Sequence, residues 1–349
     1  MAGVTYKCPN CGAYLTFDPD SQQWKCPFCS SAFPETELKG KAEAFQKEAD
    51  KEAEQSSGAQ VVYHCPSCGS EIMTDETTVA THCYYCHSPV VLQGKLTADM
   101  KPDEVLPFTI GREKAIEEIS EWIRTRKFVP KKFFSKAQIQ EMSGVYYPHF
   151  VSECQTEGVL DGEATTSDVF DEGKYVVTHT RHYHVRREGR FVFKDILRPA
   201  LSKANRKLTE GVHPFPLENA KPFSGAFLSG FLAERRDLEA DSYRQEIEQE
   251  LQGYMNSMLR DTASQYQTCS ASTTATVKKI KTKYVLLPTW VLTYPNKKNK
   301  DEPYYYVMNG CTGQVCGKLP VDMGRLWRHG LLAGLIVAAL FCVLAYFLF

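Results

Sequence analysis

Residues 8–29 read CPNCGAYLTFDPDSQQWKCPFC, and residues 65–86 read CPSCGSEIMTDETTVATHCYYC. Both segments have the spacing C-x2-C-x14-C-x2-C, and a shift of 57 positions places every cysteine of the first on a cysteine of the second. A pattern that recurs at a fixed offset is an internal repeat. The chain therefore contains two copies of one four-cysteine unit, formed by Cys8, Cys11, Cys26, Cys29, Cys65, Cys68, Cys83 and Cys86.

This spacing is typical of a zinc site. A C-x2-C turn presents two thiolates from one short loop, and two such turns complete a tetrahedron of sulfur ligands. Each unit of about 30 residues is too short to bury a self-sufficient core, and metal binding supplies about 10–16 kcal/mol of apparent folding free energy. We therefore expect two Zn2+ ions per chain. Four protein ligands leave no open position, which favours a structural site over a catalytic one.

Three other interpretations compete with zinc. Full disulfide pairing is disfavoured because no signal peptide precedes the first copy and the count of 13 cysteines is odd. A thioredoxin-like redox motif is a single C-x-x-C rather than a tandem of pairs. Iron accepts the same four thiolates, so zinc and iron both fit the geometry. We interpret His64, His82 and His87, which flank the second copy, as outer-shell or exposed residues.

The other end of the sequence is apolar. Residues 331–349 carry no charge, and together with Gly330 they form 20 residues, enough for a helix of about 30 Å that matches a bilayer core. A buried core helix is the alternative. We expect residues 326–349 to be a transmembrane tail anchor. Arg325, Arg328 and His329 precede the run, so the positive-inside rule predicts a single-pass protein of the bacterial cell membrane with its N-terminal part in the cytoplasm.

Small residues recur at every fourth position of this apolar run. Gly330, Gly334 and Ala338 would lie on one face of the helix. Such a stripe lets two membrane helices approach closely. The pattern predicts association between helices through these three residues, against the alternative of ordinary small-residue content.

The remaining sequence suggests the domain organisation. Residues 1–34 and 61–94 are the two expected ribbons, and the Glu-, Lys- and Ala-rich residues 35–60 are an expected charged helical spacer. Residues 105–322 are an expected α+β domain. The predicted fold class is therefore multidomain: two small β zinc ribbons, an α+β domain with weak internal duplication, and one C-terminal transmembrane helix.

The duplication within the α+β domain is predicted from two similar runs of motifs. Each run begins with a Pro-Phe pair, at Pro107-Phe108 and at Pro222-Phe223. A helical segment follows in each case, at residues 113–128 and 238–265, and then an apolar-Pro β region. The apolar stripes of the two helices are expected to face the core; they are Ala115, Ile116, Ile119, Trp122 and Ile123, and Tyr243, Ile247, Leu251, Met255 and Met258.

We expect structural roles for three further features. Asn309-Gly310 and Gly313 between β-rich runs predict a hairpin. His179, His182 and His184 lie in a strand-like run, where we expect a solvated polar face; an anionic lipid or acidic partner surface is the alternative. The cysteines outside the repeat are expected to be ordinary small apolar residues; they include Cys154, Cys269, Cys311 and Cys316.

Charge and motifs limit the function. The net charge of the chain is -1; residues 1–34 are neutral, and residues 61–94 carry three acidic residues and no Lys or Arg. Because binding to phosphates requires basic residues, we do not expect a nucleic-acid partner, although a membrane-tethered nucleic-acid-binding protein is the alternative function. The sequence contains no P-loop, G-x-G-x-x-G, G-x-S-x-G or H-E-x-x-H motif, so we do not expect an enzyme.

Several motifs, taken in order, resemble a known family. They are the two C-P-x-C-G knuckles, Leu106-Pro107-Phe108-Thr109-Ile110, Gly144-Val145-Tyr146-Tyr147-Pro148, Gly230-Phe231-Leu232-Ala233-Glu234-Arg235, Leu287-Pro288-Thr289-Trp290, Met308-Asn309-Gly310-Cys311-Thr312-Gly313, and Gly317-Lys318-Leu319-Pro320-Val321-Asp322. Together they span nearly the whole chain. The chain resembles bacterial membrane-anchored proteins with TFIIB-type zinc ribbons, encoded beside phage-shock-protein-A and flotillin-like (SPFH) proteins. Cys311 departs from that family, in which a polar residue is expected.

The resemblance implies a scaffold or recruiter in a membrane-stress complex. The residues themselves favour a membrane-anchored adaptor with closed zinc sites, the bilayer as one partner and membrane-associated proteins as others. The resemblance implies phage-shock-protein-A-like or SPFH/flotillin-like partners. We expect the two ribbons to be rigid recognition elements carried on the spacer.

Overall fold

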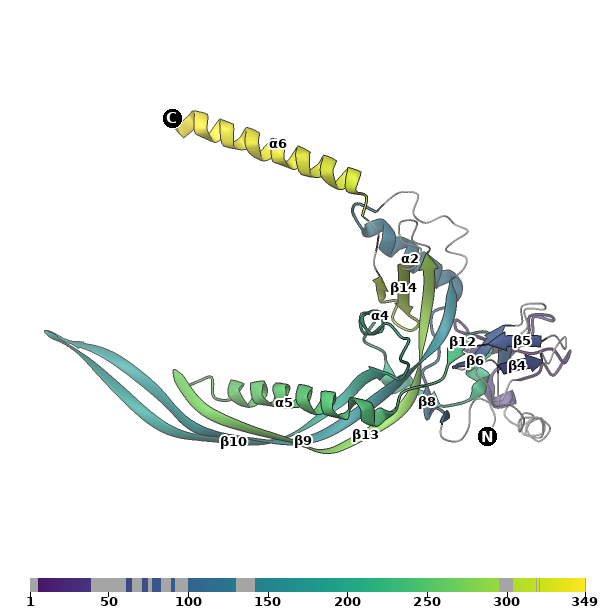
Figure 1. The fold of residues 1–349 in the computed structure, drawn as a ribbon, viewed down its shortest axis with the longest axis horizontal. Helices are drawn as coiled ribbons and strands as arrows, with labels where there is room; N and C mark the ends of the chain where they lie inside the picture. Colours follow the sequence, from purple (N-terminus) through teal and green to yellow (C-terminus); the bar gives the residue numbers. More distant parts are fainter. Residues whose placement is uncertain are drawn as a thin grey trace.

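The computed structural model describes residues 6–38, 61–64, 71–74, 77–82, 89–91, 100–129, 142–294, 304–317, 319 and 321–348. The described part is dominated by a ten-stranded sheet with helices beside it (Figure 1). The strands of this sheet are β6 (Thr78–His82), β7 (Pro89–Val91), β8 (Glu104–Val105), β9 (Ser143–Glu172), β10 (Tyr175–Pro199), β11 (Lys221–Pro222), β12 (Leu232–Glu234), β13 (Thr268–Tyr294), β14 (Tyr304–Asn309) and β15 (Val315–Gly317).

Three very long strands form the centre of the sheet. β9 pairs antiparallel with β10 on one side and with β13 on the other. β9 and β10 continue beyond the end of β13 as a long curved hairpin that projects from the body (Figure 1). Burial alternates along much of β9, as expected for a strand with one covered face.

Two short strands run parallel to the long ones. β8 lies beside β13, with Val105 opposite Leu286, and β12 lies beside β9, with Ala233 opposite Tyr146. Each short strand is followed in sequence by a helix and then by a long strand. β11, which contains the second Pro-Phe motif's proline, pairs directly with β8. The internal duplication itself stays a prediction.

The first predicted helix is confirmed as α2 (Arg112–Thr125). Ala115 and Ile119 are buried, and Trp122 and Ile123 pack against the same hydrophobic cluster. The helix ends at Thr125, three residues before the predicted end at residue 128. Phe128 has a φ of 67°, which is incompatible with a right-handed helix.

The second predicted helix begins later and ends earlier than expected, as a 3-10 turn (Ala240–Tyr243) followed by α5 (Arg244–Asp261). Its buried stripe continues from Met255 to Leu259, while Met258 is 43% exposed. The prediction for Met258 was therefore wrong, because a spacing of four keeps Leu259 on the face that meets the sheet. Gly158 of β9 allows this close approach: an added Cβ would lie 2.8 Å from the Met255 side chain.

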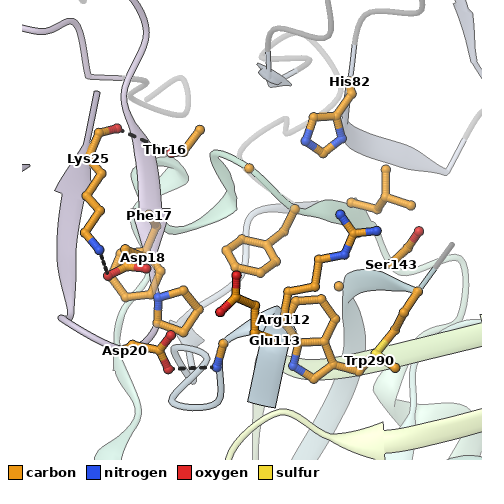
Figure 2. A pocket seen from close by; sticks show the side chains of 17 residues that line it. Thr16, Phe17, Asp18, Asp20, Lys25, His82, Arg112, Glu113, Ser143 and Trp290 are labelled. Atoms are coloured by element: carbon orange, nitrogen blue, oxygen red, sulfur yellow. Dashed lines mark hydrogen bonds and ion pairs between the residues drawn. The ribbon is translucent and has the colours of Figure 1, made fainter. Parts of the chain in front are cut away.

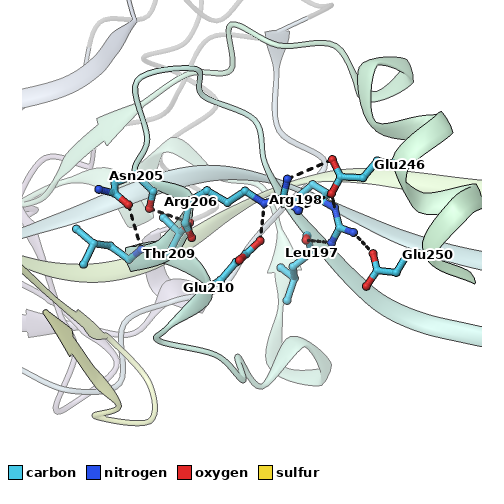
Figure 3. A network of polar contacts seen from close by, with 9 residues as sticks. Leu197, Arg198, Asn205, Arg206, Thr209, Glu210, Glu246 and Glu250 are labelled. Atoms are coloured by element: carbon cyan, nitrogen blue, oxygen red, sulfur yellow. Dashed lines mark hydrogen bonds and ion pairs between the residues drawn. The ribbon is translucent and has the colours of Figure 1, made fainter. Parts of the chain in front are cut away.

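An ionic network holds α5 and the short helix α4 (Arg206–Glu210) to the end of β10 (Figure 3). Arg198 is 8% exposed and forms ion pairs with Glu246 and Glu250 of α5. Arg206 of α4 forms ion pairs with Glu246 and with Glu210. Because Glu246 is shared, this network fixes the two helices and the strand relative to one another.

The first four-cysteine segment forms a separate small sheet but shares the main core. Its strands are β1 (Thr16–Asp18), β2 (Gln23–Lys25) and β3 (Ala32–Phe33). Phe17 and Trp24 pack against Phe227 at ring-centroid distances of 5.3 Å each. Trp24 belongs to the same buried cluster as Phe108 and Trp290. The aromatic side chains of the first segment are therefore covered by side chains of the larger domain.

Strands of the second four-cysteine segment are also described. β4 (Val61–His64) pairs with β5 (Glu71–Thr74), and β6 pairs with β7 and with β12 of the main sheet. Ala80 lies opposite Ala233. β6 and β7, from the second half of this segment, therefore belong to the ten-stranded sheet, whereas β4 and β5 form a separate two-stranded sheet. Residues 39–60 of the predicted spacer lie outside the described residues, whereas residues 35–38 are helical.

The predicted hairpin is confirmed: β14 pairs antiparallel with β15, with Met308 opposite Val315. After the hairpin comes the helix α6 (Met323–Leu348). Residues 323–341 of this helix have a mean hydropathy of 1.2, and none of this apolar stretch is buried. Its length and composition suffice to span a membrane. Figure 1 shows α6 leaving the body toward the same side as the tip of the β9–β10 hairpin.

Candidate metal centre

The structure brings together the first four predicted ligands. One Sγ atom from each of Cys8, Cys11, Cys26 and Cys29 lies within 4.8 Å of the others. The closest pairs are Cys11–Cys26 at 3.4 Å, Cys8–Cys29 at 3.5 Å and Cys11–Cys29 at 3.6 Å. These separations are too long for disulfide bonds, whose S–S length is about 2.0 Å. The four cysteines lie close enough to bind one metal ion.

The dimensions of the cluster suit zinc. Four sulfur atoms at about 2.3 Å from a central ion form a tetrahedron with edges of about 3.8 Å. The three shortest separations are 3.4–3.6 Å and every pair lies within 4.8 Å, so the observed range brackets that edge length. Four thiolates also provide the soft donor set that zinc and iron accept.

Each cysteine pair is shaped by a tight backbone turn. In the first, the Gly12 N–H donates to the Cys8 carbonyl at 2.9 Å, and Gly12 has a φ of 77°. In the second, the Ser30 N–H donates to the Cys26 carbonyl at 3.0 Å, and Ser30 has a φ of 58°. Both turns use the left-handed backbone region at the position after the second cysteine, which aims two sulfurs at one point.

Ser31 joins the two turns, and the sequence interpretation missed it. Its carbonyl accepts a hydrogen bond from the Cys26 N–H at 2.8 Å, and its hydroxyl accepts one from the Asn10 side chain at 2.9 Å. Ser31 Oγ also lies 3.3 Å from Cys29 Sγ. The repeat contained a signal for it, because Ser88 occupies the matching position 57 residues later.

The surroundings of the four cysteines favour deprotonation of Cys29 at a lower pH than an ordinary cysteine. Hydrogen bonding by Ser31, side chain first and backbone second, together with Cys26, lowers the pKa of Cys29 to about 6. A second thiolate beside the first is disfavoured by like-charge repulsion. A divalent cation removes that penalty, so metal binding is coupled to the release of the remaining thiol protons.

The geometry of the second predicted set of four cysteines is not described by the structure. Cys65, Cys68, Cys83 and Cys86 lie outside the described residues. In sequence, the first pair lies between β4 and β5 and the second pair between β6 and β7. Each pair therefore lies, in sequence, between two strands that pair antiparallel. The count of two zinc ions stays a prediction.

The other predicted roles are largely confirmed. Cys154 is buried, and Cys269, Cys311 and Cys316 pack against hydrophobic clusters. His182 and His184 are exposed on β10, and His184 Nε2 lies 3.2 Å from an Asp161 oxygen. Their strand face is therefore solvated and polar, as predicted.

A cleft of about 730 Å³ lies between the first ribbon and the start of α2 (Figure 2). Its lining includes the apolar side chains of Phe231 and Trp290 and the polar side chains of Asp18, Asp20 and Arg112. Asp20 also accepts a hydrogen bond from the Gly111 N–H at 3.1 Å, which ties the ribbon to the helix. His82 lines the same cleft, immediately before Cys83 in sequence.

Comparison with known proteins gives one extensive similarity. The chain is 27% identical over 338 residues to the uncharacterized protein YdjG of Bacillus subtilis strain 168, and the match covers 96% of each chain. No family model matches the chain. No solved structure matches it either. The similarity therefore extends across the cysteine segments, the sheet and α6 together.

Proposed function

We propose that this protein is a membrane-anchored zinc-ribbon adaptor that recruits protein partners to the cytoplasmic face of the bacterial cell membrane. The observation that carries the proposal is the closed cluster of four cysteines in the same chain as an uncovered apolar helix. The first suits a structural metal site, and the second suits a bilayer. The resemblance described above suggests a membrane-stress complex as the setting.

The cysteine cluster supports an adaptor rather than a metalloenzyme. Catalytic zinc sites usually have three protein ligands and leave one position for water or substrate. Here four sulfurs enclose one point, and Ser31 and Asn10 brace the two turns that carry them. A zinc ion at this point stabilises a rigid surface loop. We extend the same role to the second set of cysteines.

The composition of α6 supports membrane anchoring. Large apolar side chains along the helix are exposed, including Leu335 at 70% and Phe341 at 74%. A soluble surface does not leave such a continuous apolar helix uncovered. Arg325, Arg328 and His329 precede the apolar part, and by the positive-inside rule they support the proposal of a cytoplasmic N-terminal domain.

Insertion requires a change in the direction of α6. The β9–β10 hairpin extends to the same side as α6 (Figure 1) and carries exposed ionic groups such as Asp168 and Arg181. These groups do not enter hydrocarbon without a large cost. The apolar part of α6 must therefore turn away from the hairpin. Gly330 lies at the start of the apolar part and is a suitable point for a bend, because glycine has a low helix propensity.

The proposed partners are of two kinds. One is a membrane-associated protein, for which the resemblance suggests phage-shock-protein-A-like or SPFH/flotillin-like proteins. The other is a second membrane helix that packs on the stripe of Gly330, Gly334 and Ala338. Both follow from an adaptor that is held at the membrane and presents protein-binding surfaces there.

The test combines partner identification with dependence on both features. Full-length protein is cross-linked in intact bacterial membranes, purified, and its partners are identified by mass spectrometry. The membrane-bound fraction of each partner is then measured in cells with wild type, Cys11→Ser/Cys68→Ser, or a chain ending at residue 329. We expect that fraction to fall severalfold in both variants.

Cys269→Ser is the matched control, because it removes a cysteine outside the two sets and should leave recruitment intact. The adaptor proposal is overturned when no protein depends on this chain for its membrane association. Salt-sensitive recovery of nucleic acid instead of protein would support the nucleic-acid-binding alternative.

A further inference from the structure

The chain that follows α2 is in direct contact with the start of α6, although about 200 residues separate them in sequence. The Asp322 N–H donates to the Phe128 carbonyl at 2.7 Å. Arg325 Nη1 donates to the Val129 carbonyl at 3.3 Å. The Phe128 and His329 rings meet edge to face, with centroids 5.3 Å apart. These three contacts tie the chain after α2 to the first two turns of α6.

Basic side chains surround this junction. Arg124, Arg126 and Lys127 are exposed at the end of α2, and Arg325 and Arg328 lie on the first turns of α6. We call these five residues the basic rim. Within residues 121–129 and 321–329, the carboxylates are those of Glu121 and Asp322. The rim therefore has a clear excess of positive charge, even though the whole chain has a net charge of -1.

The position of the rim relative to a bilayer follows from its attachment. Under the proposed function, residues from Gly330 onward enter the hydrocarbon, so residues 322–329 lie at the headgroup level. Phe128 and Val129 contact those residues and are held at the same level whatever the tilt of the helix. Arg126 and Lys127 are within two residues of Phe128 and Arg124 is four residues away, so the chain separates them from Phe128 by at most about 7 and 14 Å. The rim thus lies within about 14 Å of the headgroup level, a distance comparable to the Debye length.

Two aromatic side chains support the same orientation. Trp327 is 66% exposed beside the apolar part of α6. Tryptophan is enriched at the level where membrane helices cross the headgroups. Trp122 is half-buried, and the Arg126 guanidinium lies 4.9 Å from its ring centroid. Trp122 therefore lies beside the rim and can report on its surroundings.

We propose that the basic rim binds anionic lipid headgroups and so holds the α2 end of the soluble domain against the cytoplasmic membrane surface. Lys and Arg close to a membrane are attracted by anionic lipids within a Debye length. The rim combines cations from two distant segments, so its charge depends on the folded contact between α2 and α6. This inference rests on the proposed membrane insertion of α6, but not on the metal sites or on any protein partner.

The experiment uses full-length protein with Trp327→Phe, reconstituted in nanodiscs. The discs contain equal fractions of brominated phosphatidylglycerol or brominated phosphatidylcholine, whose bromine atoms quench nearby indoles. Trp24 and Trp290 are buried in the protein core and provide a constant background. We expect brominated phosphatidylglycerol to quench Trp122 about twofold more than brominated phosphatidylcholine, and 0.5 M NaCl to remove most of the difference.

The rim variant is Arg124→Gln/Arg126→Gln/Lys127→Gln, which should lose the preference for the anionic lipid. The control is Lys174→Gln/Arg190→Gln/Lys194→Gln, which removes the same charge from exposed positions on the β9–β10 hairpin. The control should quench like the parent protein. Circular dichroism of each variant checks that the fold is intact.

The possible results separate the two proposals. Protein that enters the discs but is quenched equally by both lipids overturns the rim inference and leaves membrane anchoring intact. An unchanged preference in the rim variant also overturns it. Protein that does not enter discs at all contradicts the membrane anchoring on which both depend. A preference lost in the rim variant alone supports the inference.

Discussion

The Trp24 indole N–H donates a hydrogen bond of 3.0 Å to the carbonyl of Ala226, a residue 202 positions later in the chain. Trp24 itself is 1% exposed and contacts the rings of Tyr6, Phe17 and Phe227. The first four-cysteine segment therefore shares the core of the larger domain, and Trp24 is one of the side chains that join the two.

Trp24→Ala is expected to destabilise the whole described domain rather than the ribbon alone. Removal of a buried tryptophan typically costs about 3–5 kcal/mol, because its contacts and its hydrogen bond are lost and a cavity remains. Urea unfolding of the full chain, followed by circular dichroism in detergent, measures the change. Phe28→Ala is the matched control, since Phe28 lies in the second cysteine turn but is 77% exposed; it should cost less than about 0.5 kcal/mol. Equal effects of the two substitutions would contradict the shared core.

Local sequence patterns predicted the elements but not how they combine. The cysteine spacing predicted the cluster, Asn309-Gly310 predicted the hairpin, and helical periodicity predicted α2 and α5. The pairing of Ala80 with Ala233 was not predictable, because the sequence of a short strand does not specify which strand about 150 residues away will pair with it. The contact between Trp24 and Ala226 was not predictable for the same reason. A tryptophan in the sequence indicates a buried side chain, but it does not indicate which distant segment will pack against it.

The cysteines predict a specific metal content. Full-length protein should contain two zinc ions per chain, one for each four-cysteine set. Elemental mass spectrometry of the purified protein measures this content. Cys11→Ser and Cys68→Ser should each reduce the content by about one, and the double variant should retain little metal. Cys11 is exposed, so its replacement removes a ligand with little direct effect on the core.

The control for metal content is Cys154→Ser or Cys269→Ser, which lies outside both sets and should retain both ions. Folded wild-type protein without metal would refute the site. Iron in place of zinc would keep the four ligands but change the identity of the ion. One ion in wild type, lost in Cys11→Ser only, would restrict the proposal to the first set.

His149 predicts a dependence of stability on pH. It is 2% exposed, its Nδ1 lies 3.2 Å from the Tyr147 carbonyl, and its Nε2 has no hydrogen-bond partner among the described residues. Desolvation lowers the pKa of His149 from an ordinary 6.5 to about 4. Between these values the unfolded chain binds a proton that the folded chain does not, so the free energy of unfolding falls as pH decreases.

For this residue the loss between pH 7.5 and 5.0 is about 2 kcal/mol. His149→Gln removes the titrating group, so its stability should fall less over the same range. Urea unfolding at the two pH values measures both proteins. Acid also protonates the zinc thiolates, but that effect is common to both and cancels in the difference. Identical pH dependence of the two proteins would contradict a neutral buried His149.

Asn309 predicts the largest effect of a single polar substitution at the hairpin. The side chain is fully buried; its Nδ2 donates to the carbonyls of Val212 and Pro214 at 2.9 and 3.0 Å. Its Oδ1 accepts from the N–H groups of Cys311 and Thr312 at 2.8 and 3.1 Å. Asn309 therefore shapes the turn and also joins it to residues 212–214, which follow α4.

Asn309→Ala leaves these four backbone groups without their partner and should cost about 2–4 kcal/mol in urea unfolding, because unsatisfied buried groups are expensive. Asn309→Asp keeps the two accepted bonds but places an oxygen against the carbonyls of Val212 and Pro214, so it should also destabilise. Gln314→Ala, on the exposed side of the same turn, should change stability by less than about 0.5 kcal/mol. If Asn309→Asp were as stable as wild type, the donated bonds would contribute nothing, and the turn alone would explain the need for asparagine.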